Sequence, residues 1–150
     1  MKSRMLIDGP TAEFINKHRL AHLATADSSG SPAVVPVCYA FDGESIYSAL
    51  DEKPKSVAPH SLKRVRNIES NPRVSLVIDD YDENWSKLAY ALVPGVAQII
   101  EPEGASSTEH RRAVELLRAK YPQYHSMAID KMPIIKITPV RVRMWRAAAR

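Results

Sequence analysis

The sequence predicts a mainly β fold: an antiparallel barrel with added helices, formed as a single domain over residues 1–150. About seven short apolar runs bounded by turn residues predict strands. Helical patterns occur only near the start, in the middle and near the end, so the regular strand–helix alternation of a parallel sheet is missing. A chain of 150 residues can bury a full core but is short for two domains.

The first third predicts a helix followed by an antiparallel meander. Residues 11–18 form the expected helix, because Pro10 suits a helix start and an apolar face follows. Three strands are then expected, over residues 20–26, 32–41 and 45–50. Asp42 and Gly43 form a strong hairpin signal before the third. Pro36 cannot donate to a sheet ladder, so it marks an edge, a bulge or backbone left free for a ligand.

A short helix, capped by Ser61, is expected after the third strand. Its apolar residues recur every three positions and should face inward, with polar residues on the other sides. The apolar residues are Leu62, Val65 and Ile68, and the polar residues are Lys63, Arg64, Arg66 and Asn67.

The second half predicts further strands and one longer helix. Strands are expected over residues 73–79, 88–93, 95–100, 134–138 and 140–145, and the segments on either side of Pro94 and Gly95 are two strands or one interrupted strand. The helix is capped by Ser107 or Thr108 and ended by Pro122, with an apolar stripe that contains Val114, Leu117 and Tyr121.

Composition limits the partners and the compartment. The net charge of +4 is modest, and the basic residues do not form the continuous stripe of a nucleic-acid reader. The single Cys38 excludes an intramolecular disulfide and fits a reducing compartment. The sequence lacks a signal-peptide pattern, and no uncharged apolar run reaches the roughly 18 residues of a membrane helix. We therefore expect a soluble, cytoplasmic protein without nucleic-acid or membrane partners.

The stretch from residue 47 to residue 72 is the most informative part of the chain. An apolar strand there opens into a cationic loop and then a short helix, which is a plausible cradle for a phosphate or another oxyanion. After Asp51 and Glu52 it contains five cations, Lys53, Lys55, Lys63, Arg64 and Arg66, and no carboxylate lies between the first and the last of them. A solvated surface loop explains the same residues equally well, so the residue types alone leave both interpretations open.

No self-sufficient catalytic site is visible. The five glycines are isolated, so neither common phosphate-binding glycine loop can be written. The histidines lack metal-like spacing, and Cys38 lies mid-strand among apolar residues, where a buried free thiol is expected. We therefore expect no metal and assign no catalytic residue. If the protein is an enzyme, a bound cofactor should supply the chemistry.

Several segments in order resemble the pyridoxamine 5′-phosphate oxidase-like superfamily, the split β-barrel flavin- and deazaflavin-binding proteins. Residues 23–43 (LATADSSGSPAVVPVCYAFDG) look like its opening hairpin. The segments IYSALDEKPK, LKRVRNIESNPRVSLVID and YDENW, at residues 46–55, 62–79 and 81–85, resemble its probable coenzyme F420-dependent branch. The resemblance runs from about residue 20 to residue 100, with a weaker match at the C-terminus.

This resemblance implies a homodimeric split β-barrel of the FMN-binding-protein type, with two cofactor sites at the subunit interface. The cofactor phosphate would be held by Lys53 and Lys55, with Arg64 or Asn67 nearby. The ring system would lie against two strands, near Val35, Pro36, Val37, Ser48 and Ala49. Trp85 and Trp145 are candidates for the cofactor or substrate pocket, in the same subunit or the other one, and packing in the core or the dimer explains them equally well.

The resemblance favours an F420-dependent oxidoreductase that transfers hydride between the deazaflavin and a small organic substrate. Arg141 and Arg143 are not followed by the histidine of the pyridoxine-phosphate oxidase substrate motif, so synthesis of pyridoxal phosphate is not expected. F420 carries a polyanionic tail that Lys63, Arg64 and Arg66 suit. FMN shares the tricyclic ring and the phosphate, so an FMN-dependent oxidoreductase or a non-catalytic flavin- or F420-binding protein stays open.

Overall fold

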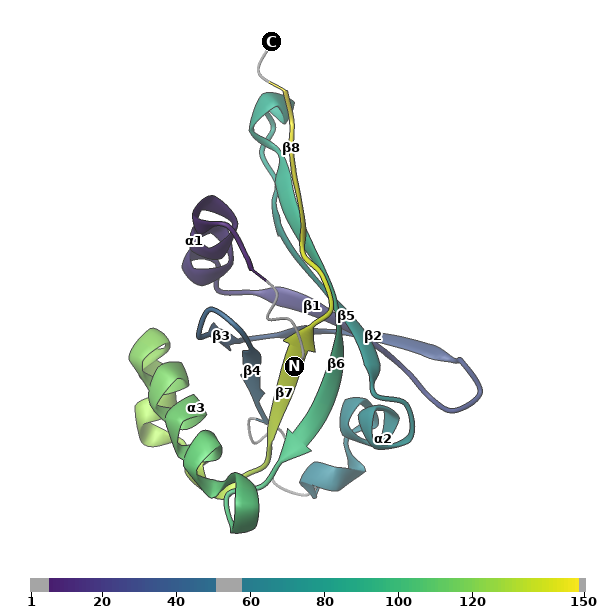
Figure 1. The fold of residues 1–150 in the computed structure, drawn as a ribbon, viewed down its shortest axis with the longest axis vertical. Coiled ribbons are helices and arrows are strands. Elements are labelled where there is room, and N and C mark those ends of the chain that lie inside the picture. Colours follow the sequence, from purple (N-terminus) through teal and green to yellow (C-terminus); the bar gives the residue numbers. More distant parts are fainter. Residues whose placement is uncertain (1–5, 51–57, 149–150) are drawn as a thin grey trace.

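A computed structural model describes residues 6–50 and 58–148 (Figure 1). The strands of the described residues are β1 (Ala21–Ala26), β2 (Pro32–Val37), β3 (Ala40–Phe41), β4 (Ile46–Ala49), β5 (Arg73–Asp80), β6 (Ala89–Ile100), β7 (Ile134–Pro139) and β8 (Arg143–Arg146). The α-helices are α1 (Gly9–Lys17), α2 (Lys63–Ser70) and α3 (Ser107–Lys120). Five 3₁₀ turns complete the list: η1 (Pro59–Ser61), η2 (Trp85–Lys87), η3 (Gly104–Ser106), η4 (Pro122–Ser126) and η5 (Ile129–Lys131).

The strands form one antiparallel sheet, and a two-residue link connects the strands at its two ends. The order along the sheet is β2-β1-β5-β6-β7-β4-β3, and β8 pairs with β6 beside this path. β2 and β3 lie at opposite ends of the order, yet only Cys38 and Tyr39 separate them in the chain. The sheet must therefore curl back on itself, which confirms the predicted split antiparallel β-barrel with added helices.

The helices cover different parts of the barrel. Phe14 and Ile15 of α1 and Val65 and Ile68 of α2 are buried in the main core with the inward residues of the strands. α3 packs on β3 and β4 and forms a second apolar cluster with them (Figure 1). Because β4 is enclosed between the two clusters, all four of its residues are buried.

The meander predicted for the first three strands is wrong. The run at 32–41 divides into two strands, β2 and β3, which lie at opposite ends of the sheet. β1 pairs with β2 and β5, whereas β3 pairs with β4 at the other end of the sheet. Pro36 lies opposite His22 on β2, which pairs with β1 alone, so the edge position predicted for this proline is confirmed.

Two details of the middle helix also differ from the prediction. Ser61 ends η1 and does not cap α2, whose N-cap is Leu62 with no side-chain hydrogen bond. Asn67, expected on a polar face, is buried with 2% of its surface exposed. The inward face of Leu62, Val65 and Ile68 is confirmed.

The later elements follow the predicted pattern with changed ends. The segments 88–93 and 95–100 are one strand, β6, which continues through Pro94 and Gly95. The last strand starts at Arg143 because Val140 still belongs to the turn, where its N–H bonds Pro94 O at 2.9 Å. The long helix has Ser106 at its N-cap position, with no side-chain cap, in place of Ser107 or Thr108.

Candidate functional site

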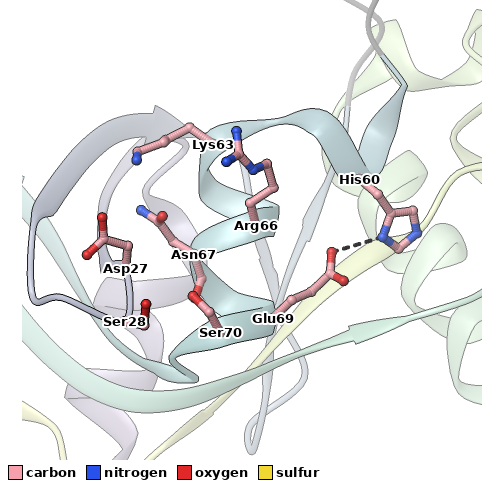
Figure 2. A pocket seen from close by; sticks show the side chains of 8 residues that line it. All are labelled: Asp27, Ser28, His60, Lys63, Arg66, Asn67, Glu69 and Ser70. Carbon is pink, nitrogen blue, oxygen red and sulfur yellow. Dashed lines mark hydrogen bonds and ion pairs between the residues drawn. The ribbon is translucent and has the colours of Figure 1, made fainter.

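A hollow of about 580 Å³ lies between α2, the turn after β1 and η1 (Figure 2). It is lined by Asp27, Ser28, His60, Lys63, Arg66, Asn67, Glu69 and Ser70. Residues 63, 66, 67 and 70 follow the i, i+3, i+4, i+7 spacing of one helix face. The apolar stripe of α2 packs into the core, so the face with Lys63 and Arg66 is left at the rim of this hollow.

The floor of the hollow is held by hydrogen bonds from α2 to the first hairpin. Asn67 Nδ2 donates to Thr25 Oγ1 at 3.0 Å, and both side chains are buried. Ser70 Oγ donates to Asn67 O at 3.1 Å. The first bond fixes α2 against β1 and gives Asn67 a structural role beside any contact with a ligand, whereas the second lies within α2.

The carboxylate of Asp27 accepts hydrogen bonds within the turn that follows β1. Asp27 Oδ1 accepts from Ser29 Oγ at 2.6 Å and from the backbone N–H groups of Ser29 and Ser31 at 2.9 and 3.0 Å. Gly30 has a φ of +87°, which an L side chain rarely adopts, and so lets the turn close. The hydrogen bond from Ser29 is the largest cause that lowers the pKa of Asp27, and nearby Lys63 adds to it.

His60 lies at the opposite wall of the hollow, between two carboxylates. Its Nδ1 is 3.0 Å from Glu69 Oε1, and its Nε2 is 3.0 Å from Glu101 Oε1 (Figure 2 shows the first pair). The hydrogen bond to Glu69 is the main cause that raises the pKa of His60. This bridge ties η1 to the end of α2 and to the residue that follows β6.

The structure brings only some of the predicted cofactor residues near the hollow. β2 packs against α2, but Val35 packs on the core that contains Val37, and only Pro36 of the three is exposed. None of the three lines the hollow. Ser48 and Ala49 are buried in β4, where Ser48 Oγ donates to Cys38 O at 2.9 Å. Their side chains therefore offer no exposed surface to a ring in one chain.

The predicted phosphate ligands divide into two groups. Lys53 and Lys55 lie outside the described residues, in the segment that ends just before η1. Arg64 is half-buried and does not line the hollow. Lys63 and Arg66, which were predicted for the anionic tail and not for the phosphate, do line it.

Trp85 and Trp145 lie away from the hollow. Both belong to an arm formed by the outer ends of β5, β6 and β8, which projects from the barrel at the end opposite to α2 (Figure 1). Trp85 is in η2 at the tip, 68% exposed, and Trp145 on β8 stacks on Tyr90 at 5.4 Å between ring centroids. Within one chain the two tryptophans therefore do not line the hollow that contains Lys63 and Arg66.

Sequence reasoning missed five lining residues. Asp27 and Ser28 follow β1, whereas the other three residues belong to η1 and α2, and the packing of α2 against β1 brings these two segments together. These residues are Asp27, Ser28, His60, Glu69 and Ser70. The helical spacing from Lys63 to Ser70 is the one local signal that could have identified part of this face.

Neither a metal centre nor a membrane-spanning helix is found among the described residues. Within residues 6–50 and 58–148, no three His, Cys, Asp or Glu side chains converge in a way that could hold a metal ion. Among the described helices, none has the length and apolar character needed to cross a membrane.

The chain is similar in sequence to one protein family and in fold to several solved structures. The family model described as pyridoxamine 5′-phosphate oxidase matches residues 7–146. No curated protein matches the chain.

Three of the similar structures belong to proteins that are described differently from one another. The conserved hypothetical protein Rv2991 from Mycobacterium tuberculosis has a TM-score of 0.73 at 23% identity, over 98% of this chain and 89% of that one. HutZ, the heme storage protein from Vibrio cholerae, has a TM-score of 0.70 at 16% identity, over 95% of each chain. A FAD-binding protein from Mesorhizobium loti has a TM-score of 0.65 at 19% identity, over 89% of this chain and 87% of that one. At these identities the likeness concerns the fold.

Proposed function

The chain belongs to the pyridoxamine 5′-phosphate oxidase family, and on that premise we propose that it is an F420-dependent oxidoreductase. It transfers hydride between the deazaflavin and a small organic substrate. Because the family match extends from residue 7 to residue 146, it applies to the whole barrel and not to one motif.

The observation that carries the proposal is the cationic face of α2. Lys63 and Arg66 line a hollow of about 580 Å³, a size within the usual range of about 300–1,000 Å³ for small-molecule sites. Their ammonium and guanidinium groups are donors suited to phosphate and carboxylate oxygens. The residues present therefore fit the anionic part of a flavin or deazaflavin.

In this proposal each group of residues has a separate task. Lys63 and Arg66, together with Lys53 and Lys55 of the preceding segment, hold the phosphate and the anionic tail. The apolar edge strand β2, with Pro36 on its exposed face, shields one face of the ring from water. When bound, the cofactor supplies the hydride, and the protein contributes binding and orientation.

The proposal includes a homodimer with the cofactor at the subunit interface. A single chain leaves the aromatic arm remote from the hollow and much of β2 exposed. A second copy would cover these apolar surfaces, and its Trp85 and Trp145 would complete the pocket. This arrangement supports the predicted roles of both tryptophans without requiring them to approach the hollow of their own chain.

FMN is the alternative cofactor, and the mixed charge of the hollow favours it. Asp27 and Glu69 line the same space as the cations. A single phosphate needs fewer positive charges than a polyanionic tail does. Repulsion by the two carboxylates should therefore weaken the binding of FMN less than that of F420. A protein that binds either cofactor without turnover of a substrate is the corresponding non-enzymatic function.

A fluorescence titration with F420 and FMN, run side by side, tests the proposal. We expect F420 to bind more tightly. The double variant Lys63→Gln/Arg66→Gln should weaken its binding by about a hundredfold or more, since two lost charged hydrogen bonds at about 1.5–3 kcal/mol each amount to about 3 kcal/mol or more. Lys55→Ala should also weaken binding far more than it lowers thermal stability.

The control is Arg111→Gln, on an exposed part of α3. It should bind F420 as the parent does. If FMN binds more tightly than F420, the FMN-dependent function replaces the F420-dependent one. Binding of neither cofactor, or affinity for hemin alone, would overturn both.

A further inference from the structure

We propose that His60 sets the charge of the α2 hollow according to pH, so that anions bind strongly only while its imidazole is protonated. The inference rests on the proposed function in one respect, that the hollow of Figure 2 holds an anion. It adds a determinant of affinity that the family relationship does not provide.

The first argument is the hydrogen bonding of the imidazole. Both ring nitrogens of His60 lie 3.0 Å from a carboxylate oxygen, one of Glu69 and one of Glu101. An ionised carboxylate accepts hydrogen bonds and cannot donate them, so both nitrogens must carry a proton. Only the imidazolium form makes the complete bridge, and a neutral ring would turn a lone pair towards one of the carboxylates.

The second argument is the charge around the hollow. The ionisable lining residues are Asp27, His60, Lys63, Arg66 and Glu69, whose net charge is +1 with the imidazolium and zero with the neutral ring. Glu101, beside the hollow, faces His60 from the end of β6. With Glu101 counted, the sum is zero with the imidazolium and −1 with the neutral ring, so loss of the proton leaves a net negative charge beside the space where an anion would lie.

The third argument is position. His60 belongs to η1, which follows directly on the segment that carries Lys53 and Lys55. His60 and Glu69 also form the wall shared with a second hollow of about 460 Å³ over the end of β6. The bridge thus connects η1 with the end of α2 and with Glu101, and its opening would alter both the charge and the wall of the hollow.

The direction of the effect follows from these contacts. The neighbouring carboxylates raise the pKa of His60 above its usual value, so the charged form persists towards neutral pH and is lost as pH rises further. Anion affinity should fall across the same interval. The three side chains of the bridge are about half exposed, so the effect should be moderate and should shrink in high salt.

Sulfate is the appropriate probe, because it keeps both negative charges from about pH 6 to about pH 8.5, where a histidine titrates. We expect the parent protein to bind sulfate about threefold to tenfold more weakly at the higher pH in low salt, as judged from the ¹⁵N amide shifts of α2. A constant affinity, or no sulfate binding at the lower pH, would overturn the proposal.

Three variants separate the charge effect from a general structural one. His60→Gln should bind sulfate weakly and equally at both pH values, whereas Glu69→Gln and Glu101→Gln should each recover part of the affinity lost at high pH. His125→Gln is the control, since that histidine is exposed on η4 and its Nε2 contacts Arg118 O at 2.6 Å. A parent-like pH dependence in His60→Gln would contradict the assignment.

Thermal unfolding provides a second readout. A raised folded-state pKa means that the bridge stabilises the fold below the unfolded pKa of about 6.5, and that this contribution disappears as pH rises through the folded value. The melting temperatures of parent and His60→Gln should therefore converge at high pH. Failure of the sulfate test would leave the F420 and FMN titrations valid, so the two proposals can fail separately.

Discussion

At the scale of single residues, Lys120 is notable for its buried ammonium group. Within the described residues its Nζ has no hydrogen-bond partner. It lies 4.0 Å from the ring centroid of Tyr39 and 5.5 Å from that of Tyr121. Burial is the main cause that lowers its pKa to about 8, and the charge of Arg19 adds to it. The aromatic rings offset part of the desolvation cost but supply no acceptor.

We predict that Lys120→Met raises the free energy of unfolding by about 1 kcal/mol at neutral pH, because the missing hydrogen bonds of a buried charge cost more than the cation–π contacts return. The unfolded lysine binds its proton up to about pH 10.5 and the folded one only up to about 8. Parent stability therefore rises with pH across this interval, and the advantage of the variant should vanish there.

Urea denaturation at both ends of this pH interval measures the Lys120 effect. Lys87→Met, at an exposed residue of η2, is the control and should leave stability unchanged at each pH. A variant less stable than the parent at neutral pH would show that the cation–π contacts dominate.

Asn67 gives a second prediction at this scale. Its amide donates to Thr25 Oγ1, and both residues are buried. Asn67→Ala should lower the free energy of unfolding by about 1–3 kcal/mol, because the hydroxyl of Thr25 loses its partner. Chemical denaturation would detect this loss. Arg66→Ala, on the exposed side of the same helix, should unfold like the parent, and similar losses in both would contradict a specific role for Asn67.

At the scale of elements, β6 depends on the close approach of β7. Gly95 pairs with Val74 on one side and with Pro139 on the other. A Cβ at Gly95 would lie 2.8 Å from Thr138 O and 2.9 Å from Ile137 Cγ2. Since the first of these atoms belongs to the backbone of the neighbouring strand, the strands would have to separate to accept a side chain.

Gly95→Ala should therefore destabilise the protein by about 1–3 kcal/mol, the usual cost of overpacking. Gly9→Ala is the matched control, because the added methyl group at that helix position meets no atom within 4 Å. Thermal and urea unfolding of both variants tests the difference. Equal stability of Gly95→Ala and the parent would mean that the two strands adjust without cost.

The elements themselves could be predicted from the sequence because their signals are local. The alternation of Val74, Leu76 and Ile78 identified β5, and the spacing of Val65 and Ile68 identified the inner face of α2. Which strands pair depends on how the whole sheet closes, and the pattern of a short segment does not indicate this. The apolar run at 32–41 therefore predicts one strand, although its first and last residues belong to strands at opposite ends of the sheet.

The candidate site was only partly predictable for the same reason. The sequence indicated Lys63 and Arg66 only as extra cations for an anionic tail and favoured Lys53 and Lys55 for the phosphate, whereas the structure places Lys63 and Arg66 in the hollow. Asn67 was misplaced, because its partner Thr25 is 42 positions away and periodicity alone makes any polar residue look exposed. The bridge from His60 to Glu101 spans 41 positions and had no local signal.

At the scale of the whole molecule, the arm exposes more aromatic surface than the barrel body does. Tyr81 and Trp85 at its tip are each 68% exposed, and Tyr90 and Trp145 are 39% and 43% exposed. β8 pairs only with the outer part of β6, from Ala89 to Leu92. An exposed apolar patch of this kind on a projecting element is typical of an interaction surface.

We therefore predict that the protein is a dimer in solution and that the double variant Tyr81→Ser/Trp85→Ser weakens the dimer by about thirtyfold or more, because interface tryptophan and tyrosine residues often contribute 2 kcal/mol or more. Sedimentation equilibrium measures the dissociation constant. Leu20→Ser, an exposed apolar residue outside the arm, is the control. A monomeric parent, or a variant that still dimerises with the parent's affinity, would contradict the arm's role. If the partner's arm completes the cofactor pocket, F420 binding should fall together with dimerisation, whereas a self-contained site would bind F420 equally well in the monomeric variant.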